Sequence, residues 1–419
     1  MMPPMYLAYE VFFYLVFILF IPWYVLAGAI RGKPRFIVEK LGFFRDRAAE
    51  HDVWIHAVSV GEVAAARAVV DRLLALRPSM RILVTSTTVT GLAMARRFFP
   101  DLTIAHFPFD LSWVVKRFIR HYRPRVYATM ETEIWPTVSR VVRASGIRLL
   151  LANGRISDHS YPRYQLIRFL LKRVLAEYDV ILARDEMDRD RFIRIGAPPE
   201  RVEIGGNVKF DFEVDRSRVA FADRLDSLVA GRKVFVAGST VEGEDEMLVS
   251  TIREIVRRGI FVVVAPRKPE RFEEVAAILE AKGLRWVRRT RIDDPVDAVD
   301  VLLLDSIGEL PKVFRWGTAA FIGGSLVPRG GHNPIEPAAV GTPVAFGPFM
   351  SNFREVAATL LEMRAAVQVD SPAALLEFVV RMTTHASEQR EYSARCLEAV
   401  QRNRGAAERT ANRIVDLLG

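Results

Sequence analysis

Two parts of the chain repeat one pattern, in which short apolar runs alternate with amphipathic stretches. In the first half, runs rich in β-branched and aromatic residues occur at 53–59, 81–87, 102–108, 125–131, 147–153, 179–185 and 201–206. Between them lie helical patterns such as EVAAARAVVDRLLALR, with apolar residues at i, i+3 and i+4. Apolar runs separated by helices are typical of parallel strands buried on both faces. The first half is therefore predicted to be a doubly wound α/β domain.

The pattern restarts in the second half, with apolar runs at 233–240, 259–268, 284–289, 300–306, 319–325 and 342–348. The charged stretch 211–227 separates the two sets. We predict two Rossmann-like domains, 31–210 and 211–419, facing one another across a cleft, and leave open whether the last helix crosses back. In such domains ligands bind at the carboxyl ends of the strands.

Residues 1–30 show a different pattern. Between Met5 and Ala29 the only charged residue is Glu10. As a helix, the uncharged stretch 11–29 would measure about 28 Å, close to a bilayer core of roughly 30 Å. Aromatic residues stand where they anchor helices at membrane interfaces: Tyr6, Tyr9, Trp23 and Tyr24. This segment therefore predicts a membrane anchor.

Basic residues follow the apolar segment at once: Arg31, Lys33, Arg35, Lys40, Arg45 and Arg47. The positive-inside rule then places the rest of the chain in the cytoplasm. A cleaved signal peptide would carry its positive charges before the apolar run, so we favour a retained anchor. Pro22 leaves open a helix that lies in the membrane interface instead of spanning.

Composition excludes several classes of protein. The net charge of +9 and pI near 9.8 favour anionic partners, but no nucleic-acid-binding motif is present, so nucleic acid is not expected. The single cysteine, Cys396, excludes a disulfide framework. The seven histidines form no HxxxH or HExxH pair, so the sequence predicts no metal site.

The segment FIGGSLVPRGGHNPIEPAAVGTPVAFGP, residues 321–348, places a polar, glycine-rich loop between two predicted strands. Asn333, Pro334 and Glu336 suit the N-cap, first and third positions of a helix, which is one interpretation, a capping-box-like turn. The other is that this helix start, with Arg329 and His332, receives a phosphate while Glu336 accepts hydrogen bonds from a ribose or base. Capping alone does not require the RGGH loop, so we favour a ligand site.

Seven stretches distributed along the chain point to one family: HAVSVGE, METEIWP, ANGRIS, GNVKFD, APRKPERF, SIGEL and GGSLVPRGGHNPIEPA. Through them nearly the whole chain resembles the 3-deoxy-D-manno-oct-2-ulosonic acid (Kdo) transferases of lipopolysaccharide synthesis, membrane-associated glycosyltransferases of the GT-B fold. The resemblance implies transfer of Kdo from CMP-Kdo to the primary hydroxyl on the distal glucosamine of the lipid A precursor (lipid IVA). It places the protein at the inner membrane and implies no cofactor.

Glu62 is the first candidate catalytic residue. It follows a predicted strand at the start of a helix, where the helix dipole favours a carboxylate whatever its role. That location is expected to keep Glu62 ionised, as a base requires, while lowering its basicity. By resemblance Glu62 is the proton acceptor.

Further roles also follow from the resemblance. Glu131 helps to stabilise the transition state, Lys209 offsets the charge on the departing CMP, and the role of Glu133 stays open. The residues implied to bind CMP-Kdo are Pro266, Arg267, Ile307, Gly308, Glu309, Asn333, Pro334, Ile335 and Glu336. Because CMP is a single phosphate monoester and no DxD pair lies near the nucleotide loops, direct inverting displacement without a metal is expected.

Two further expectations concern the surface that meets the lipid acceptor and the alternative functions. The segment YPRYQLIRFLLKRVL (161–175) either faces an anionic membrane through Arg163, Arg168, Lys172 and Arg173 or is an ordinary amphipathic helix. The rivals are another GT-B enzyme that uses a UDP-sugar, such as a UDP-N-acetylglucosamine 2-epimerase, and a membrane-tethered binding module. The oligomeric state and the number of Kdo units transferred stay open.

Overall fold

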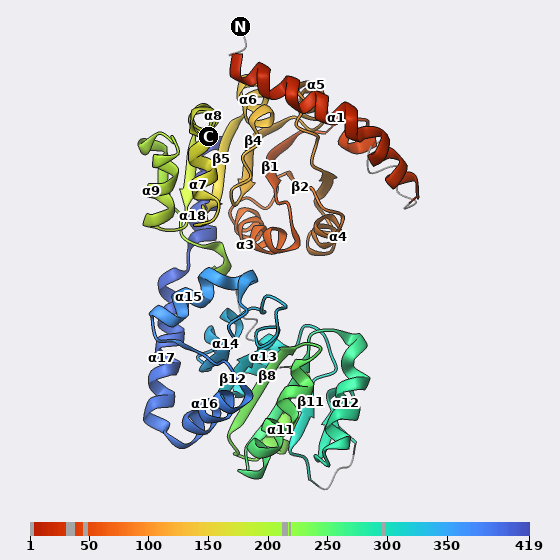
Figure 1. Cartoon of the computed structure of the whole chain (residues 1–419), viewed down its shortest axis with the longest axis vertical. Coiled ribbons are helices and arrows are strands. Elements are labelled where there is room, and N and C mark those ends of the chain that lie inside the picture. Colours follow the sequence, from red (N-terminus) through yellow and green to blue (C-terminus); the bar gives the residue numbers. More distant parts are fainter. Residues whose placement is uncertain (1–3, 31–37, 45–48, 212–216, 218, 295–297) are drawn as a thin grey trace. The chain divides into compact units, whose positions relative to one another are not determined.

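The structure is a computed structural model that describes residues 4–30, 38–44, 49–211, 217, 219–294 and 298–419. It consists of two compact units, shown in Figure 1. Unit 1 comprises Met1–Asp211 and Arg404–Gly419, and unit 2 comprises Phe212–Asn403. The last helix, α18 (Ala406–Leu418), therefore belongs to unit 1.

Unit 1 is built on a seven-stranded parallel sheet of order β3-β2-β1-β4-β5-β6-β7. Its strands are β1 (His51–His56), β2 (Ile82–Ser86), β3 (Thr103–His106), β4 (Pro124–Met130), β5 (Arg148–Gly154), β6 (Val180–Ala183) and β7 (Val202–Ile204). Its other helices are α1 (Pro4–Ile30), α3 (Val60–Leu76), α4 (Val89–Phe98), α5 (Ser112–Tyr122), α6 (Pro136–Ala144), α7 (Tyr161–Leu166), α8 (Arg168–Leu175), α9 (Glu186–Arg194) and the 3₁₀ turns η1 (Pro199–Arg201) and η2 (Val208–Asp211).

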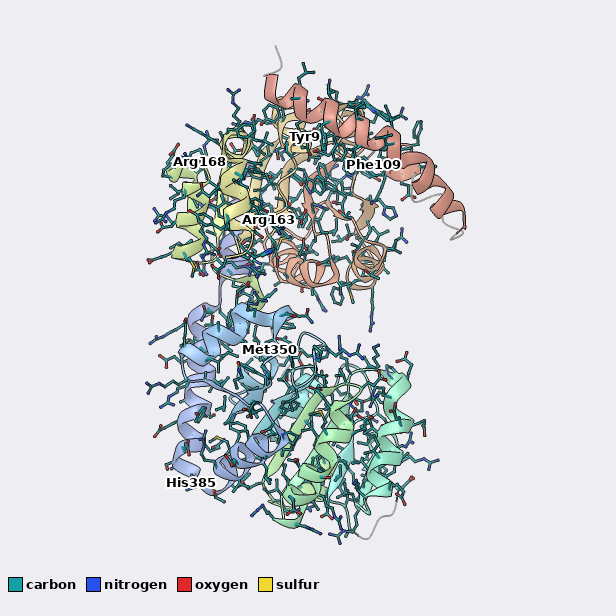
Figure 2. The ribbon with its side chains drawn as sticks, viewed as in Figure 1. Tyr9, Phe109, Arg163, Arg168, Met350 and His385 are labelled. Carbon is teal, nitrogen blue, oxygen red and sulfur yellow. The ribbon has the colours of Figure 1, made fainter. Side chains whose placement is uncertain are left out.

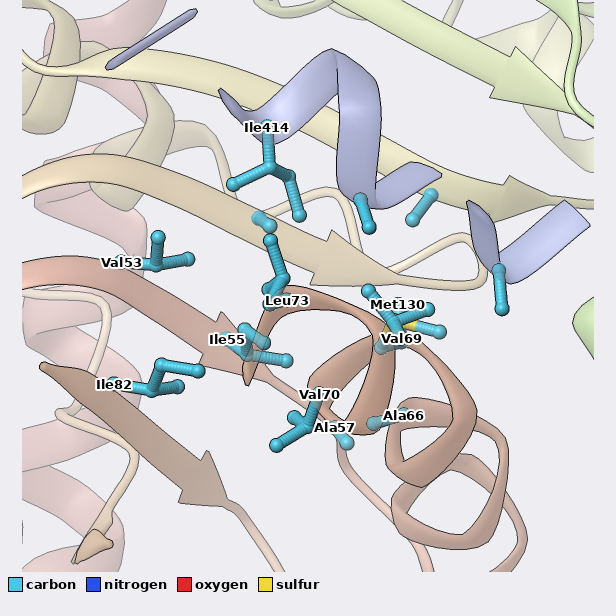
Figure 3. Close-up of a cluster of buried hydrophobic side chains, with 14 of the residues drawn as sticks. Val53, Ile55, Ala57, Ala66, Val69, Val70, Leu73, Ile82, Met130 and Ile414 are labelled. Atoms are coloured by element: carbon cyan, nitrogen blue, oxygen red, sulfur yellow. The ribbon is translucent and has the colours of Figure 1, made fainter. Parts of the chain in front are cut away.

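Helices cover both faces of this sheet, because successive strand residues point to opposite sides. Val53 and Ile55 of β1 pack in one buried cluster with Leu73 of α3 and Ile414 of α18, as Figure 3 shows. Trp54, between them in sequence, packs in the cluster on the other face. This double burial explains why the strands read as continuous apolar runs.

Unit 2 repeats the design with a seven-stranded parallel sheet of order β10-β11-β9-β8-β12-β13-β14. Its strands are β8 (Val234–Thr240), β9 (Phe261–Pro266), β10 (Trp286–Arg288), β11 (Val301–Leu303), β12 (Ala319–Ile322), β13 (Val344–Phe346) and β14 (Ala366–Gln368). Its helices are α10 (Ala222–Val229), α11 (Glu244–Arg257), α12 (Phe272–Ala281), α13 (Leu310–Val313), α14 (Ile335–Ala338), α15 (Arg354–Glu362), α16 (Pro372–Thr384), α17 (Ala386–Asn403) and the 3₁₀ turns η3 (Pro269–Arg271), η4 (Arg289–Arg291), η5 (Phe314–Trp316) and η6 (Ser351–Phe353).

The prediction of two doubly wound parallel α/β units is confirmed, although the short edge strand β14 was not foreseen. In unit 1 the strand order reverses between β1 and β4, and in unit 2 between β8 and β12. Open α/β sheets bind ligands at such reversals, beside the carboxyl ends of the strands. The segments that follow these strands are therefore where a ligand is expected in each unit.

Helix α1 packs along unit 1 through specific polar and aromatic contacts. The Tyr9 hydroxyl donates to Asp110 Oδ2 at 2.8 Å, and Phe17 meets Phe109 edge-on at 5.3 Å between centroids; Figure 2 labels Tyr9 and Phe109. Glu10, the only charge in the apolar segment, pairs with Arg140 at 3.1 Å. One side of α1 is thus fixed to the protein.

The anchor predicted for residues 1–30 is not supported: in the part of the chain that the structure describes, no helix has both the length and the apolar character needed to cross a membrane. Tyr6 is buried and Tyr9 is bonded to Asp110, so neither serves as the predicted interfacial anchor. Lys40, one of the basic residues that follow the apolar segment, is buried as well. The side chains of Trp23 and Tyr24, and residues Arg31, Lys33, Arg35, Arg45 and Arg47, lie outside the described residues.

Candidate active site

Glu62 lies in the first turn of α3, directly after the carboxyl end of β1. Ser59 is the N-cap of this helix and donates its hydroxyl to Glu62 Oε1 at 3.0 Å. The backbone N–H of Val58 donates to Glu62 Oε2 at 2.8 Å. The carbonyl oxygen of Val58 in turn accepts from the hydroxyls of Ser86 at 2.8 Å and Thr88 at 3.0 Å, so the loop that carries Glu62 is tied to the neighbouring strand.

The net pKa shift of Glu62 is opposite to the one expected from its place at a helix start. Burial, together with the nearby carboxylates of Glu131 and Glu133, raises the pKa of Glu62 to about 7, although the hydrogen bonds from Val58 and Ser59 oppose this shift. Desolvation disfavours the charged form of a carboxyl group, and here it outweighs those bonds. Glu62 is thus a carboxyl group with a pKa near neutrality.

Glu131 and Glu133 follow the carboxyl end of β4, the strand that pairs with β1. Glu131 has a φ of 56°, a left-handed conformation that non-glycine residues rarely adopt. Its N–H donates to Ala152 O at 2.8 Å. Glu133 accepts from the Trp135 indole N–H at 3.0 Å, and burial raises the pKa of Glu133. Glu131 and Glu133 therefore face Glu62 as fixed acidic neighbours.

Lys209 lies in the turn η2 after β7, and its ammonium is 3.8 Å from Glu131 Oε1. The side-chain oxygen of Asn207 accepts from the N–H of Lys209 at 3.1 Å. Asn153, at the end of β5, accepts from the N–H of Val208 at 3.2 Å and so holds the same turn. The structure therefore brings three residues from distant motifs together at the carboxyl ends of the strands in the unit 1 sheet: Glu62, Glu131 and Lys209.

In unit 2 the glycine-rich loop follows β12 at the point where the strand order reverses. A Cβ on Gly323 would lie 2.4 Å from Ser239 O, so the close approach of β8 and β12 requires glycine here. The carbonyl of Gly323 is 2.8 Å from Nδ1 of His332. His332 is partly buried, and burial lowers the pKa of His332, which favours the neutral ring with Nδ1–H donating to this carbonyl.

The start of this loop is held by Glu244, whose carboxylate accepts from the N–H groups of Gly324, Ser325 and Leu326 at 2.6, 2.8 and 2.8 Å. Glu244 is the first residue of α11 and is fully buried. These three N–H groups bind a carboxylate of the protein itself. Glu244 was not foreseen from the sequence, although Gly243–Glu244 follows β8 much as Gly61–Glu62 follows β1.

The helix expected from Asn333 begins one residue later than predicted. α14 covers only Ile335–Ala338 and its N-cap is Pro334, so Pro334 and Glu336 do not occupy the predicted first and third positions. Asn333 still accepts from the N–H of Ile335 at 3.1 Å and donates to Glu336 Oε1 at 3.4 Å. Burial raises the pKa of Glu336 to about 7, against the effects of Asn333 and Arg267.

The structure separates the cations of the RKPER stretch. Arg271 is buried in ion pairs with Asp245 at 2.8 Å and Glu274 at 3.2 Å. Arg267, which directly follows Pro266 at the end of β9, is exposed and lowers the pKa of Glu336 through its charge. Of these two arginines, Arg267 is the one available to an anionic ligand near Glu336.

The Ile307–Gly308–Glu309 stretch follows β11 and precedes α13. Gly308 has a φ of 91°, which suits glycine, and Ile307 is exposed. Both oxygens of Glu309 accept from Arg289 at 2.7 Å, so this carboxylate is committed to an ion pair. The Glu309 side chain is therefore not available to a ligand, which leaves the backbone N–H groups of this stretch as candidate donors.

Two surface hollows lie among the described residues, one in each unit. One, of about 420 Å³ in unit 2, is lined by Gly330 of the glycine-rich loop, by Met350 and by Arg354 of α15; Figure 2 labels Met350. The other, of about 440 Å³ in unit 1, lies at Pro124 and Ile147, near the amino ends of β4 and β5, away from Glu62. Within the described ranges, no three His, Cys, Asp or Glu side chains are grouped to hold a metal ion.

Comparison with known proteins identifies the family. Residues 36–212 match the sequence profile of the family described as 3-deoxy-D-manno-octulosonic-acid transferase (kdotransferase). The chain is 33% identical over 396 residues to the 3-deoxy-D-manno-octulosonic acid transferase of Haemophilus influenzae, covering 92% of both chains. The chain belongs to this family. This Kdo transferase family member is also 32% identical to the 3-deoxy-D-manno-octulosonic acid transferase of Bordetella pertussis. The alignment covers 88% of this chain and 87% of the Bordetella enzyme.

The fold is shared more widely than the family. The UDP-GlcNAc 2-epimerase of Neisseria meningitidis, solved with UDP-GlcNAc, aligns with 88% of this chain and 99% of its own at a TM-score of 0.56, with 11% identity. The architecture of this Kdo transferase family member is thus that of GT-B enzymes. Family membership makes it a glycosyltransferase in particular.

Proposed function

We propose that this protein transfers Kdo from CMP-Kdo to the primary hydroxyl of the lipid A precursor, with inversion at the anomeric carbon and Glu62 as the general base. The observation that carries the proposal is the buried Glu62 carboxyl, with a pKa near 7 and both oxygens oriented by Ser59 and Val58. A general base is most effective when its pKa lies near the working pH.

The transfer is a single displacement. The Glu62 carboxylate takes the proton of the acceptor hydroxyl, and the oxygen attacks the anomeric carbon of Kdo. The bond from that carbon to the phosphate oxygen breaks, and CMP leaves with the electron pair. Attack opposite the leaving group, with one base, gives inversion, as in inverting glycosidases. Lys209 and Glu131 are assigned to stabilising the charges of the transition state.

The donor is assigned to unit 2. Arg267 supplies a cation for the phosphate, and the backbone of Ile307–Glu309 supplies N–H donors. Glu336, whose pKa is raised to about 7 by burial, sits against Asn333 and faces Arg267, which suits recognition of the ribose or the base. Pro266, Pro334 and Ile335 shape the backbone around these groups.

The membrane assignment rests on α1 and on α7–α8. The side of α1 away from its contacts with Asp110 and Arg140 exposes large apolar side chains: Leu7, Val11, Phe12, Leu15, Ile18 and Leu19. Helices α7 and α8 expose Leu166 and Phe169 beside the basic residues Arg163, Arg168, Lys172 and Arg173. Apolar faces with basic flanks bind anionic membrane surfaces. We infer that both lie in the interface of the inner membrane, on its cytoplasmic side.

The decisive experiment is an assay of the purified protein with lipid IVA and either CMP-Kdo or UDP-sugars, with mass analysis of the product. We expect a mass gain of Kdo with CMP-Kdo alone. Glu62→Gln keeps the size of the side chain but removes the base, so we expect a loss of roughly 10²- to 10⁴-fold in kcat. Glu377→Gln, on the exposed side of α16, is the matched control and is expected to keep full activity.

Transfer from a UDP-sugar would favour another GT-B activity, and no transfer by the wild type would favour a binding module. Undiminished turnover by Glu62→Gln would refute the assignment of the base.

A further inference from the structure

Arg184 is a buried arginine that directly follows β6. It lies at the carboxyl ends of the strands in the unit 1 sheet, as Glu62 does. Its backbone N–H donates to Gly154 O at 3.1 Å, which continues the pairing of β6 with β5. Its side chain is only 3% exposed. A buried guanidinium is costly to desolvate unless it is paired with an anion and hydrogen-bonded. A buried Arg184 side chain therefore requires an anionic group beside it.

Arg184 pairs with the carboxylate of Glu131. Nη2 of Arg184 donates to Glu131 Oε1 at 2.9 Å, and the ammonium of Lys209 lies 3.8 Å from the same oxygen. The backbone of Glu131 is already constrained by its positive φ and by its bond to Ala152 O. The Arg184 contact adds a constraint on the side chain, so that the Glu131 carboxylate has a fixed place beside Lys209.

The two cations differ in burial. The side chain of Lys209 is 18% exposed, whereas that of Arg184 is 3% exposed. A guanidinium has planar, preorganised donors, while an ammonium on a flexible stem makes a softer contact. Arg184 is therefore suited to fix Glu131 from the protein side, and Lys209 remains the cation accessible to solvent.

We propose that Arg184 is a positioning residue for the transfer reaction, which binds Glu131 and thereby fixes the arrangement of Glu131 and Lys209 at the edge of the sheet. The inference rests on the proposed function, because it gives Arg184 a place in that reaction. Arg184 does not touch the reacting atoms in this account; it acts through Glu131.

The test is a double-mutant cycle in the full chain, with CMP-Kdo and lipid IVA as substrates. The variants are Arg184→Met, Glu131→Gln and the two combined, with Arg184→Lys as the conservative change. Arg194→Met, at an exposed position of α9, is the matched control. Steady-state kcat and KM are measured for each variant, and thermal melting reports whether each is folded.

We expect Arg184→Met to lower kcat by about 100-fold, the size of effect that a displacement of about 1 Å produces, with much smaller changes in KM. Arg184→Lys should recover part of this loss because it keeps the charge. In the Glu131→Gln background, Arg184→Met should lower kcat by less than about 3-fold, because groups that act through one another are not additive. Arg194→Met should match the wild type.

An equally large effect of Arg184→Met in both backgrounds would overturn the inference, as would a folded Arg184→Met variant with normal kcat. If Arg184→Met does not fold, the cycle is run with Arg184→Lys, and an unchanged kcat for that variant overturns the inference. If the wild type transfers Kdo normally and any of these results is found, the inference about Arg184 fails and the proposed function stands. Absence of transfer by the wild type overturns both.

Discussion

Glu62 shows how burial changes the chemistry of a common local motif. A serine N-cap with a glutamate three residues later is a capping box, which normally stabilises a helix start and leaves the carboxylate exposed and ionised. Here Ser59 and Glu62 have that spacing, but the Glu62 carboxylate accepts from the Ser59 hydroxyl and the Val58 N–H, is only 9% exposed and lies near two other carboxyl groups. The same residues therefore cap the helix and provide a carboxyl group that is basic near neutral pH.

This environment predicts the pH dependence of turnover. Glu62 must be ionised to accept a proton, and burial raises the pKa of Glu62 to about 7. kcat/KM should therefore fall about tenfold per pH unit below pH 7 and level off above it. Initial rates of Kdo transfer measured from pH 5 to pH 9 check this expectation.

Glu133 supplies the control for that profile. Because the Glu133 carboxylate raises the pKa of Glu62, Glu133→Gln should move the acid limb to lower pH. A limb that stays in place, or moves to higher pH, would contradict the electrostatic explanation. A limb at the ordinary pKa of an exposed glutamate in the wild type would contradict the assignment to Glu62.

At the scale of elements, the loop after β12 depends on a contact with the start of α11. The three N–H groups of Gly324, Ser325 and Leu326 would be buried without partners if the Glu244 carboxylate were absent. Buried unpaired donors cost more free energy than a hydrogen bond contributes. Glu244 therefore determines the path of the chain toward His332 and Asn333.

Glu244→Gln should lower the free energy of unfolding of unit 2 by about 3 kcal/mol, because the amide accepts fewer bonds and loses the charge. It should also raise KM for CMP-Kdo, since the donor loop starts at this contact. Denaturant unfolding followed by circular dichroism, with kinetics on the folded protein, tests both. Glu377→Gln should change neither value, and an equally stable Glu244→Gln variant with wild-type KM would contradict this account.

At the scale of the whole molecule, the apolar face of α1 is expected to determine membrane binding. Leu15 and Ile18 are 57% and 61% exposed, on the side of α1 away from Asp110 and Arg140. Replacing both by glutamate removes buried apolar area in the membrane interface and adds charges that anionic lipids repel. The fraction of protein that sediments with phosphatidylglycerol-containing vesicles should fall by at least about tenfold.

Leu397→Glu is the control for this experiment, because Leu397 is 46% exposed on α17 of unit 2. It should leave vesicle binding unchanged. Equal sedimentation of the α1 variant and the wild type would show that α1 does not mediate binding. Equal loss in both variants would indicate a general effect of added charge.

The sequence by itself determined the architecture, because apolar periodicity and helix patterns are local properties that each strand and helix carries. It also determined most of the candidate site: Glu62, Glu131 and Lys209 follow predicted strands within recognisable motifs, and carboxyl ends of parallel strands meet at one edge. The short strand β14 was missed, although β7, β10, β11 and β13 are equally short and were predicted.

Only the tertiary structure decided the environments of these residues. The pKa of Glu62 depends on burial and on Glu131 and Glu133, groups distant in sequence. Arg184 and Glu244 are hydrogen-bonded to partners 53 and 80 to 82 residues away, which no local pattern indicates. The apolar segment at the start of the chain gave no sign of the Glu10–Arg140 pair that fixes α1 to unit 1. Local sequence specifies which residues form an element, whereas charge, solvation and contact depend on what folding brings beside it.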